Sequence, residues 1–129
     1  MSSFRPPTPA PITLASALAL ALALAGCGDK APPEAMPAAE VPKVLDNAFG
    51  KASAEDKALA MAAQQAIQKD EQTVALEMLE ALSRKAELTP EQREAAARSA
   101  LSVRSKLLDA ASKGDKAAKD YLEEQRARK

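Results

Sequence analysis

The side chains of this chain that could take part in chemistry are few, and the first is a single thiol at Cys27. The 129 residues include no histidine and no second cysteine, so an internal disulfide and a nucleophile paired with an imidazole base are excluded. The common zinc sites are excluded too, because cysteine and histidine supply most of their ligands. We therefore expect no cofactor and no metal, and acid–base chemistry would depend on carboxylates.

The carboxylates do not form a convincing catalytic pair. Glu77 and Glu80 are one helical turn apart, and Glu123 and Glu124 are adjacent. Both pairs fall on faces that we expect to be solvated, where carboxyl pKa values stay ordinary and general-acid catalysis is inefficient. The sequence therefore predicts that the chain is not an enzyme.

Arg104 is the one charged residue on an otherwise apolar helical face, between Leu101 and Leu108. Its guanidinium either faces an anionic ligand or partner, or pairs with a glutamate of a neighbouring helix while its stem covers apolar surface. The second interpretation is favoured. The whole chain has 18 basic and 18 acidic residues, so it lacks the basic surplus that nucleic-acid binding needs.

An apolar run directly precedes Cys27. Residues 12–25 read Ile-Thr-Leu-Ala-Ser-Ala-Leu-Ala-Leu-Ala-Leu-Ala-Leu-Ala, and the residues before them carry one charge, Arg5. As a helix this run would reach about 21 Å at about 1.5 Å per residue, which is short of a hydrocarbon core of about 30 Å. A secretory signal therefore fits better than a transmembrane helix.

The end of this run, Leu24-Ala25-Gly26-Cys27, resembles the lipobox of bacterial lipoproteins. The resemblance implies that the Cys27 thiol receives a diacylglyceryl group and that a dedicated signal peptidase cuts between Gly26 and Cys27. It also implies that the new amine of Cys27 is acylated, for example with palmitate. Residues 1–26 would then be the signal peptide; otherwise Cys27 is an incidental thiol after an ordinary signal or anchor.

Lipidation at Cys27 would place the protein on a membrane. Several acyl chains, at about 0.8 kcal/mol per buried CH₂, give an almost permanent anchor. In the lipoprotein family, aspartate directly after the lipidated cysteine favours retention in the inner membrane, and here that position is Gly28. The resemblance thus favours the outer membrane, with the protein facing the periplasm.

The segment after Cys27 is rich in proline. Residues 27–42 contain Pro32, Pro33, Pro37 and Pro42, and proline disrupts the hydrogen bonding of helices and sheets. We predict a lipidated cysteine followed by a flexible, disordered tether, which could lift the rest of the chain by up to about 45 Å. Residues 43–129 are then predicted to be a small α-helical domain.

Helical periodicity and capping residues occur throughout that domain. Residues 44–49 are predicted to form a short turn or helix that ends at Gly50, and Ser53 with Asp56 is predicted to cap the start of the next helix. The apolar face of that next helix is predicted to consist of Leu59, Ala63, Ala66 and Ile67, with Met61 pointing away.

A second amphipathic helix is predicted from about residue 70 to about residue 87. Its apolar stripe consists of Val74, Ala75, Met78, Leu79, Leu82 and Ala86, and its polar face of Glu77, Glu80, Arg84 and Glu87. The sequence Thr89-Pro90-Glu91-Gln92 predicts the start of a third helix, which ends near Gly114. Its apolar face consists of Ala97, Ala100, Leu101, Leu107, Leu108 and Ala111.

A fourth helix is predicted to start at Asp115, with Ala117, Ala118, Tyr121 and Leu122 on one face. No stretch alternates with period two over the length of a strand. The sequence therefore predicts an all-α fold of three to four short antiparallel helices.

Residues 66–90 resemble the second half of a tetratricopeptide unit. The likeness lies in Ala75-Leu76 at a helix start, Leu79 and Leu82 within it, and Pro90 after it. Lys113-Gly114-Asp115, followed by Ala117, is similar to the turn that opens such a helix. The resemblance implies stacked helical hairpins; generic hairpins give the same pattern, and the chain has room for two repeats where about three are usual.

The function predicted from these features is binding. We expect a membrane-anchored periplasmic lipoprotein whose helical module holds a protein partner. The alternative is a structural lipoprotein that spaces or tethers the outer membrane and peptidoglycan. The chain ends in Arg128-Lys129, similar to the major structural lipoprotein of the outer membrane, in which the terminal lysine is joined to peptidoglycan.

Overall fold

The computed structural model describes residues 31–129, which form five α-helices, one short 3₁₀ turn and no strand. The predicted all-α fold is confirmed. The 3₁₀ turn covers Ala38–Glu40, and the helices are α1 (Val41–Phe49), α2 (Ala54–Gln68), α3 (Gln72–Ser83), α4 (Pro90–Ser112) and α5 (Lys116–Ala127). There are five helices rather than three to four because the short segment before Gly50 is a helix in its own right.

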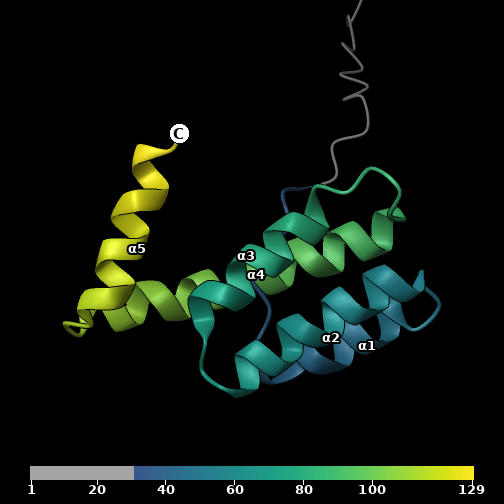
Figure 1. Ribbon diagram of the computed structural model, residues 1–129, viewed down its shortest axis with the longest axis horizontal. Helices are drawn as coiled ribbons and strands as arrows, with labels where there is room; N and C mark the ends of the chain where they lie inside the picture. The colour runs from purple at the N-terminus through teal and green to yellow at the C-terminus, as the bar shows by residue number, and fades with distance from the viewer. Residues whose placement is uncertain (1–30) are drawn as a thin grey trace, which may run out of the picture. The chain divides into compact units, whose positions relative to one another are not determined.

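Consecutive helices run back along each other as hairpins (Figure 1). The most extensive contacts join α3 to α4 and α2 to α3, and α1 packs against both α2 and α4. Helix α5 leaves the end of α4 at an angle and packs mainly on α4. The four helices α1 to α4 therefore enclose a common core, which α5 extends at one end.

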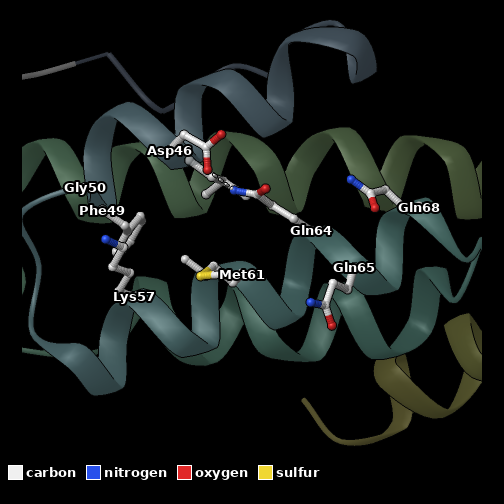
Figure 2. Close-up of a pocket in the computed structure, with 10 residues that line it drawn as sticks. Asp46, Phe49, Gly50, Lys57, Met61, Gln64, Gln65 and Gln68 are labelled. Atoms are coloured by element: carbon white, nitrogen blue, oxygen red, sulfur yellow. Dashed lines mark hydrogen bonds between the residues drawn. The ribbon is translucent and has the colours of Figure 1, made fainter.

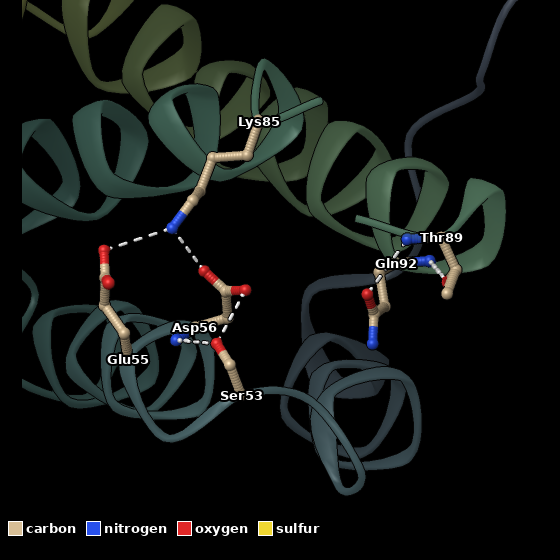
Figure 3. Close-up of polar contacts among 6 residues, drawn as sticks. All are labelled: Ser53, Glu55, Asp56, Lys85, Thr89 and Gln92. Atoms are coloured by element: carbon tan, nitrogen blue, oxygen red, sulfur yellow. Dashed lines mark hydrogen bonds and ion pairs between the residues drawn. The ribbon is translucent and has the colours of Figure 1, made fainter. Parts of the chain in front are cut away.

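Local capping explains where the helices begin. The backbone N–H of Asp56 donates to Ser53 Oγ at 3.2 Å, which caps α2. Thr89 and Gln92 form a reciprocal capping box at the start of α4, with N–O distances of 3.2 and 3.1 Å (Figure 3). Such caps satisfy backbone donors that have no partner within the helix, and both were expected from the sequence.

The turn between α4 and α5 is specified by two residues. Gly114 has a φ of +98°, a backbone conformation that side chains with a Cβ rarely adopt. Asp115 Oδ1 then accepts the backbone N–H of Ala118 at 3.0 Å and caps α5. The predicted stop and restart of the helix at these two residues are confirmed.

The core lies where α3 meets its two neighbours. Ala75, Leu76, Leu79 and Leu82 are all fully buried. The predicted stripe on this helix was partly wrong, because it included Val74, which is 40% exposed, and left out Leu76. A helix packed against both α2 and α4 buries two sides, so a single stripe underestimates its buried surface.

The predicted apolar face of α4 also needs correction. Leu108 is 48% exposed, whereas Val103, Ser99 and Ser102 are buried. This helix contacts α1, α3 and α5 at different points along its length, so its buried side changes direction and small serines are enclosed. On α2 the predicted outward direction of Met61 is confirmed by its 49% exposure.

The proline-rich segment ends earlier than the sequence indicated. Met36 is 4% exposed and belongs to the core, and the Nε of Arg98 donates to the backbone oxygen of Glu34 at 3.1 Å. Pro42 lies in the first turn of α1, where a missing N–H costs no helical hydrogen bond. Residues 36–42 are thus part of the folded unit rather than of a disordered tether.

Candidate functional site

The predicted lipidation and cleavage residues, Cys27 and Gly26, lie outside the described residues and stay predictions. Within residues 31–129 no helix is both long and apolar enough to cross a membrane. In the same part of the chain no cluster of histidine, cysteine and acidic side chains is arranged to hold a metal ion. Two hollows and one polar cluster on the helical unit are the candidate sites.

The first hollow, the α1–α2 groove, has a volume of about 270 Å³. The buried side chains of Leu45, Phe49 and Ala60 form its floor, and Met61 stands beside them, half exposed. Figure 2 shows Met61 and Phe49 extending from facing helices toward the same space. The remaining lining residues are Asp46, Gly50, Lys57, Gln64, Gln65 and Gln68.

Three glutamines follow one another along the α2 side of this groove (Figure 2). The Nε2 of Gln64 donates to Asp46 Oδ1 at 2.9 Å and to the backbone oxygen of Pro42 at 3.4 Å, and so holds α2 to α1. Gln65 and Gln68 add two more amides along the same edge. Each amide can both donate and accept, so the groove combines an apolar floor with a hydrogen-bonding edge.

The second hollow, the α3–α5 cleft, has a volume of about 670 Å³ and a mainly charged lining. Its lining residues are Glu77, Glu80, Arg84, Arg104, Gln125, Arg128 and Lys129. Glu80 of α3 accepts from Arg84, which directly follows that helix, at 3.1 Å and from Arg104 of α4 at 2.6 Å. The favoured interpretation of Arg104, a guanidinium paired with a glutamate of a neighbouring helix, is confirmed.

Tyr121 of α5 lies close to these charges. Burial raises the pKa of its hydroxyl group, and the nearby carboxylate of Glu77 raises it further. The amide of Gln125 donates to the same hydroxyl at 3.1 Å, which acts in the opposite direction. Tyr121 is the only tyrosine of a chain without tryptophan, so it is a natural optical reporter of this end of the molecule.

The polar cluster joins the start of α2 to the end of α3 (Figure 3). Lys85 Nζ lies 2.5 Å from Asp56 Oδ1 and 3.2 Å from Glu55 Oε1. Ser53 Oγ also donates to Asp56, at 2.9 Å. The predicted continuation of α3 to about residue 87 is wrong, because the helix ends at Ser83. Lys85 therefore lies in the connection after α3, where its ammonium group pairs with Asp56.

A serine beside a lysine suggests a nucleophile and its base, but the electrostatics oppose that chemistry. The hydrogen bond from Lys85, followed by that from Ser53, lowers the pKa of Asp56. The hydrogen bonds to Asp56 and Glu55 raise the pKa of Lys85, which keeps Nζ as an ammonium ion that cannot take a proton from Ser53. The cluster therefore acts as a clamp between α2 and α3.

The carboxylates first considered for catalysis are dispersed. Glu77, Glu123 and Glu124 are exposed, and Glu124 is paired with Arg128 at 2.5 Å. Glu80 differs from the expectation of a solvated face, because its side chain is only 19% exposed and contacts two guanidinium groups.

The α1–α2 groove was not foreseen from the sequence. It depends on how α1 lies across α2, which helical periodicity does not specify. The one signal for it was Met61, an apolar side chain on the outward side of its helix.

Comparison of the chain with protein-family models, with curated proteins and with solved structures gives no match in any of the three. The likenesses to lipoproteins and to tetratricopeptide hairpins therefore remain predictions that depend on the quoted motifs.

Proposed function

We propose that this protein is a lipid-anchored component of the bacterial cell envelope whose helical unit holds a protein partner in the α1–α2 groove. The observation that carries the proposal is Met61, which is 49% exposed above a floor of Leu45 and Phe49. Apolar surface with a polar rim marks sites of protein interaction, and here Met61 adds such surface to an apolar floor beside the glutamines of α2. Methionine is especially suited to such a surface because its flexible thioether adapts to different partners.

The size and edge of the groove favour a polypeptide over a small molecule. Its volume of about 270 Å³ falls just below the usual lower limit of about 300 Å³ for small-molecule pockets. One large apolar side chain of a partner segment would fill the space between Phe49 and Met61. The amides of Gln65 and Gln68 would then be placed to bond to the backbone of that segment.

The anchor would come from the amino-terminal motif. If Cys27 is lipidated, the chain between it and the buried Met36 reaches at most about 30 Å when fully extended. That reach is shorter than a tether of residues 27–42 would give, because residues 36–42 belong to the folded unit. The helical unit would therefore be held closer to the membrane surface than a tether of residues 27–42 would allow.

Site-specific photocrosslinking of the full-length protein in bacterial cells tests the binding proposal. A photoreactive residue at Gln65, which is exposed and lines the groove, should give discrete crosslinked species. The matched control at Lys119, exposed on α5, should not give them. Met61→Asp introduced with the Gln65 crosslinker should remove the species, and the proposal is wrong if they persist unchanged.

The anchor has its own test. Cys27→Ser should abolish incorporation of labelled palmitate and leave the uncleaved precursor. A variant that still matures and takes up label would show that Cys27 is not the lipidated residue. A covalent peptidoglycan adduct at Lys129 in the wild-type protein would instead support the structural, layer-tethering alternative.

A further inference from the structure

The α3–α5 cleft has a surplus of positive charge in a chain whose formal net charge is zero. Four basic side chains line it, Arg84, Arg104, Arg128 and Lys129, together with the carboxylates of Glu77 and Glu80. A third carboxylate, that of Glu124, pairs with Arg128 at 2.5 Å, so these side chains leave a surplus of one positive charge. Since the chain as a whole is balanced, this is a local concentration of cations. Such a concentration raises the local density of anionic partners.

The guanidinium groups in this cleft have unused donors. Arg84 and Arg104 each use a single nitrogen, Nη2, in the ion pairs with Glu80, whereas a guanidinium carries five N–H donors. The Arg84 side chain is 74% exposed, and that of Arg104 is 29% exposed. Both can therefore donate to an additional carboxylate while they remain held by Glu80.

The cations are spread over three helices. Arg84 directly follows α3, Arg104 lies within α4, and Arg128 and Lys129 follow α5. A compact anion would contact only part of a cleft of about 670 Å³. A chain that carries several singly charged groups at intervals would match this distribution better, and the Gln125 amide beside them suits a peptide backbone.

We infer that the α3–α5 cleft is a binding site for an acidic peptide segment whose carboxylates pair with Arg84, Arg104 and Lys129. The site is separate from the α1–α2 groove and does not depend on the function proposed for that groove. Glu80 limits the affinity of the cleft, because it already neutralises part of the charge of two arginines. Glu80 therefore acts as an internal competitor for the incoming carboxylates.

Tyr121 emission gives a direct assay with the full-length protein in detergent. It is the only tyrosine and there is no tryptophan, so a peptide of alternating glutamate and alanine can be titrated without an added label. We expect a saturable change in emission that weakens as ionic strength rises. The same peptide with glutamine in place of glutamate should leave the emission unchanged.

The variants test the charges one at a time. Arg84→Gln and, separately, Lys129→Gln should each weaken peptide binding by about fivefold, which corresponds to one partly exposed charge pair. The matched control is Arg126→Gln, which removes the same charge from an exposed position on α5 outside the cleft. Glu80→Gln should strengthen binding by a similar factor, a gain that loss of structure would not produce.

Three outcomes would overturn the inference. Binding could be equally weakened by Arg126→Gln and Arg84→Gln, which would indicate general attraction to surface charge. The glutamine peptide could bind as well as the glutamate peptide. Inorganic phosphate could displace the peptide at concentrations no higher than those of the peptide itself, which would identify a simple anion site instead.

Discussion

The region of α1 to α4 and helix α5 are stabilised in different ways. In the region of α1 to α4, large side chains such as Leu45, Phe49, Leu76 and Leu79 are almost completely enclosed. Helix α5 buries only Ala118 and Leu122, with Tyr121 partly covered. Its ion pairs, Lys116 with Asp120 and Glu124 with Arg128 just after the helix, are exposed pairs four residues apart, and such pairs contribute little to stability.

This difference bears on the two hollows. The α1–α2 groove has a floor that belongs to the enclosed core, so it should keep its shape when it is empty. The α3–α5 cleft has one wall made of α5, whose fewer buried contacts place it at the low end of local stability. We therefore expect a preformed groove and an adjustable cleft in one small molecule.

The largest effect should follow truncation in the core region. Leu79→Ala should lower the free energy of unfolding by about 2–5 kcal/mol, because Leu79 is fully buried and its loss leaves a cavity. Leu108→Ala is the matched control, since Leu108 is 48% exposed, and should change that free energy by no more than about 0.5 kcal/mol. Chemical denaturation followed by circular dichroism measures both, and equal losses would contradict this location of the core.

A second pair of variants tests where the folded unit begins. Met36→Ala should lower the free energy of unfolding by about 2 kcal/mol, because Met36 is 4% exposed. Met61→Ala, at a half-exposed methionine, should be nearly neutral. If Met36→Ala is also neutral in the same denaturation assay, residues 36–42 behave as the flexible tether that the sequence suggested.

Truncation in α5 should act locally. Leu122→Ala should lower stability by about 1–2 kcal/mol, since Leu122 lies at the edge of the core and its surroundings can collapse. Hydrogen exchange is the sharper measurement, because amides of α5 should lose protection while those of α3 keep theirs. A uniform loss of protection over both helices would show that α5 is as integral to the core as α3.

The clamp of Asp56 and Lys85 should show a pH dependence. The pKa of Asp56 is lowered in the folded state, mainly by Lys85 and then by Ser53, so its stabilising effect is present above the unfolded pKa and is lost as pH falls through the folded value. Asp56→Asn should therefore lower Tm at neutral pH, and the difference from wild type should shrink below about pH 4. Glu87→Gln is the control for an exposed carboxylate, and a constant Tm difference between Asp56→Asn and wild type would exclude the clamp.

The features that were predictable from the sequence are mainly local. The caps at Ser53, Thr89 and Asp115 and the stop at Gly114 depend on side chains within four residues of the backbone they satisfy. Their positions could be predicted because no tertiary contact is needed to form them.

The wrong predictions concern which side of a helix is buried, because the neighbouring helices determine that side. Val74 and Leu108 were placed in the core because each was assigned to a single apolar stripe, whereas α3 and α4 have several packing partners. The α1–α2 groove could not be predicted for the same reason. The Glu80–Arg104 pair was partly predictable, since a charge within an apolar face requires an opposite charge nearby.

The smallest effect, and the most direct test of how α5 packs, is the titration of Tyr121. Burial and the carboxylate of Glu77 raise the pKa of its hydroxyl, so its absorbance should titrate above the pKa of N-acetyltyrosinamide in the folded protein. Glu77→Gln should move the titration toward that of the free compound. The control is Glu87→Gln, at an exposed glutamate of the α3–α4 connection, which should leave the titration unchanged. The raised pKa also contributes stability that is present below the unfolded pKa and is lost as pH rises through the folded value. If Tyr121 instead titrates like the free compound while α3 remains helical, α5 spends most of its time away from α4, and the α3–α5 cleft lacks the wall on which its peptide site depends.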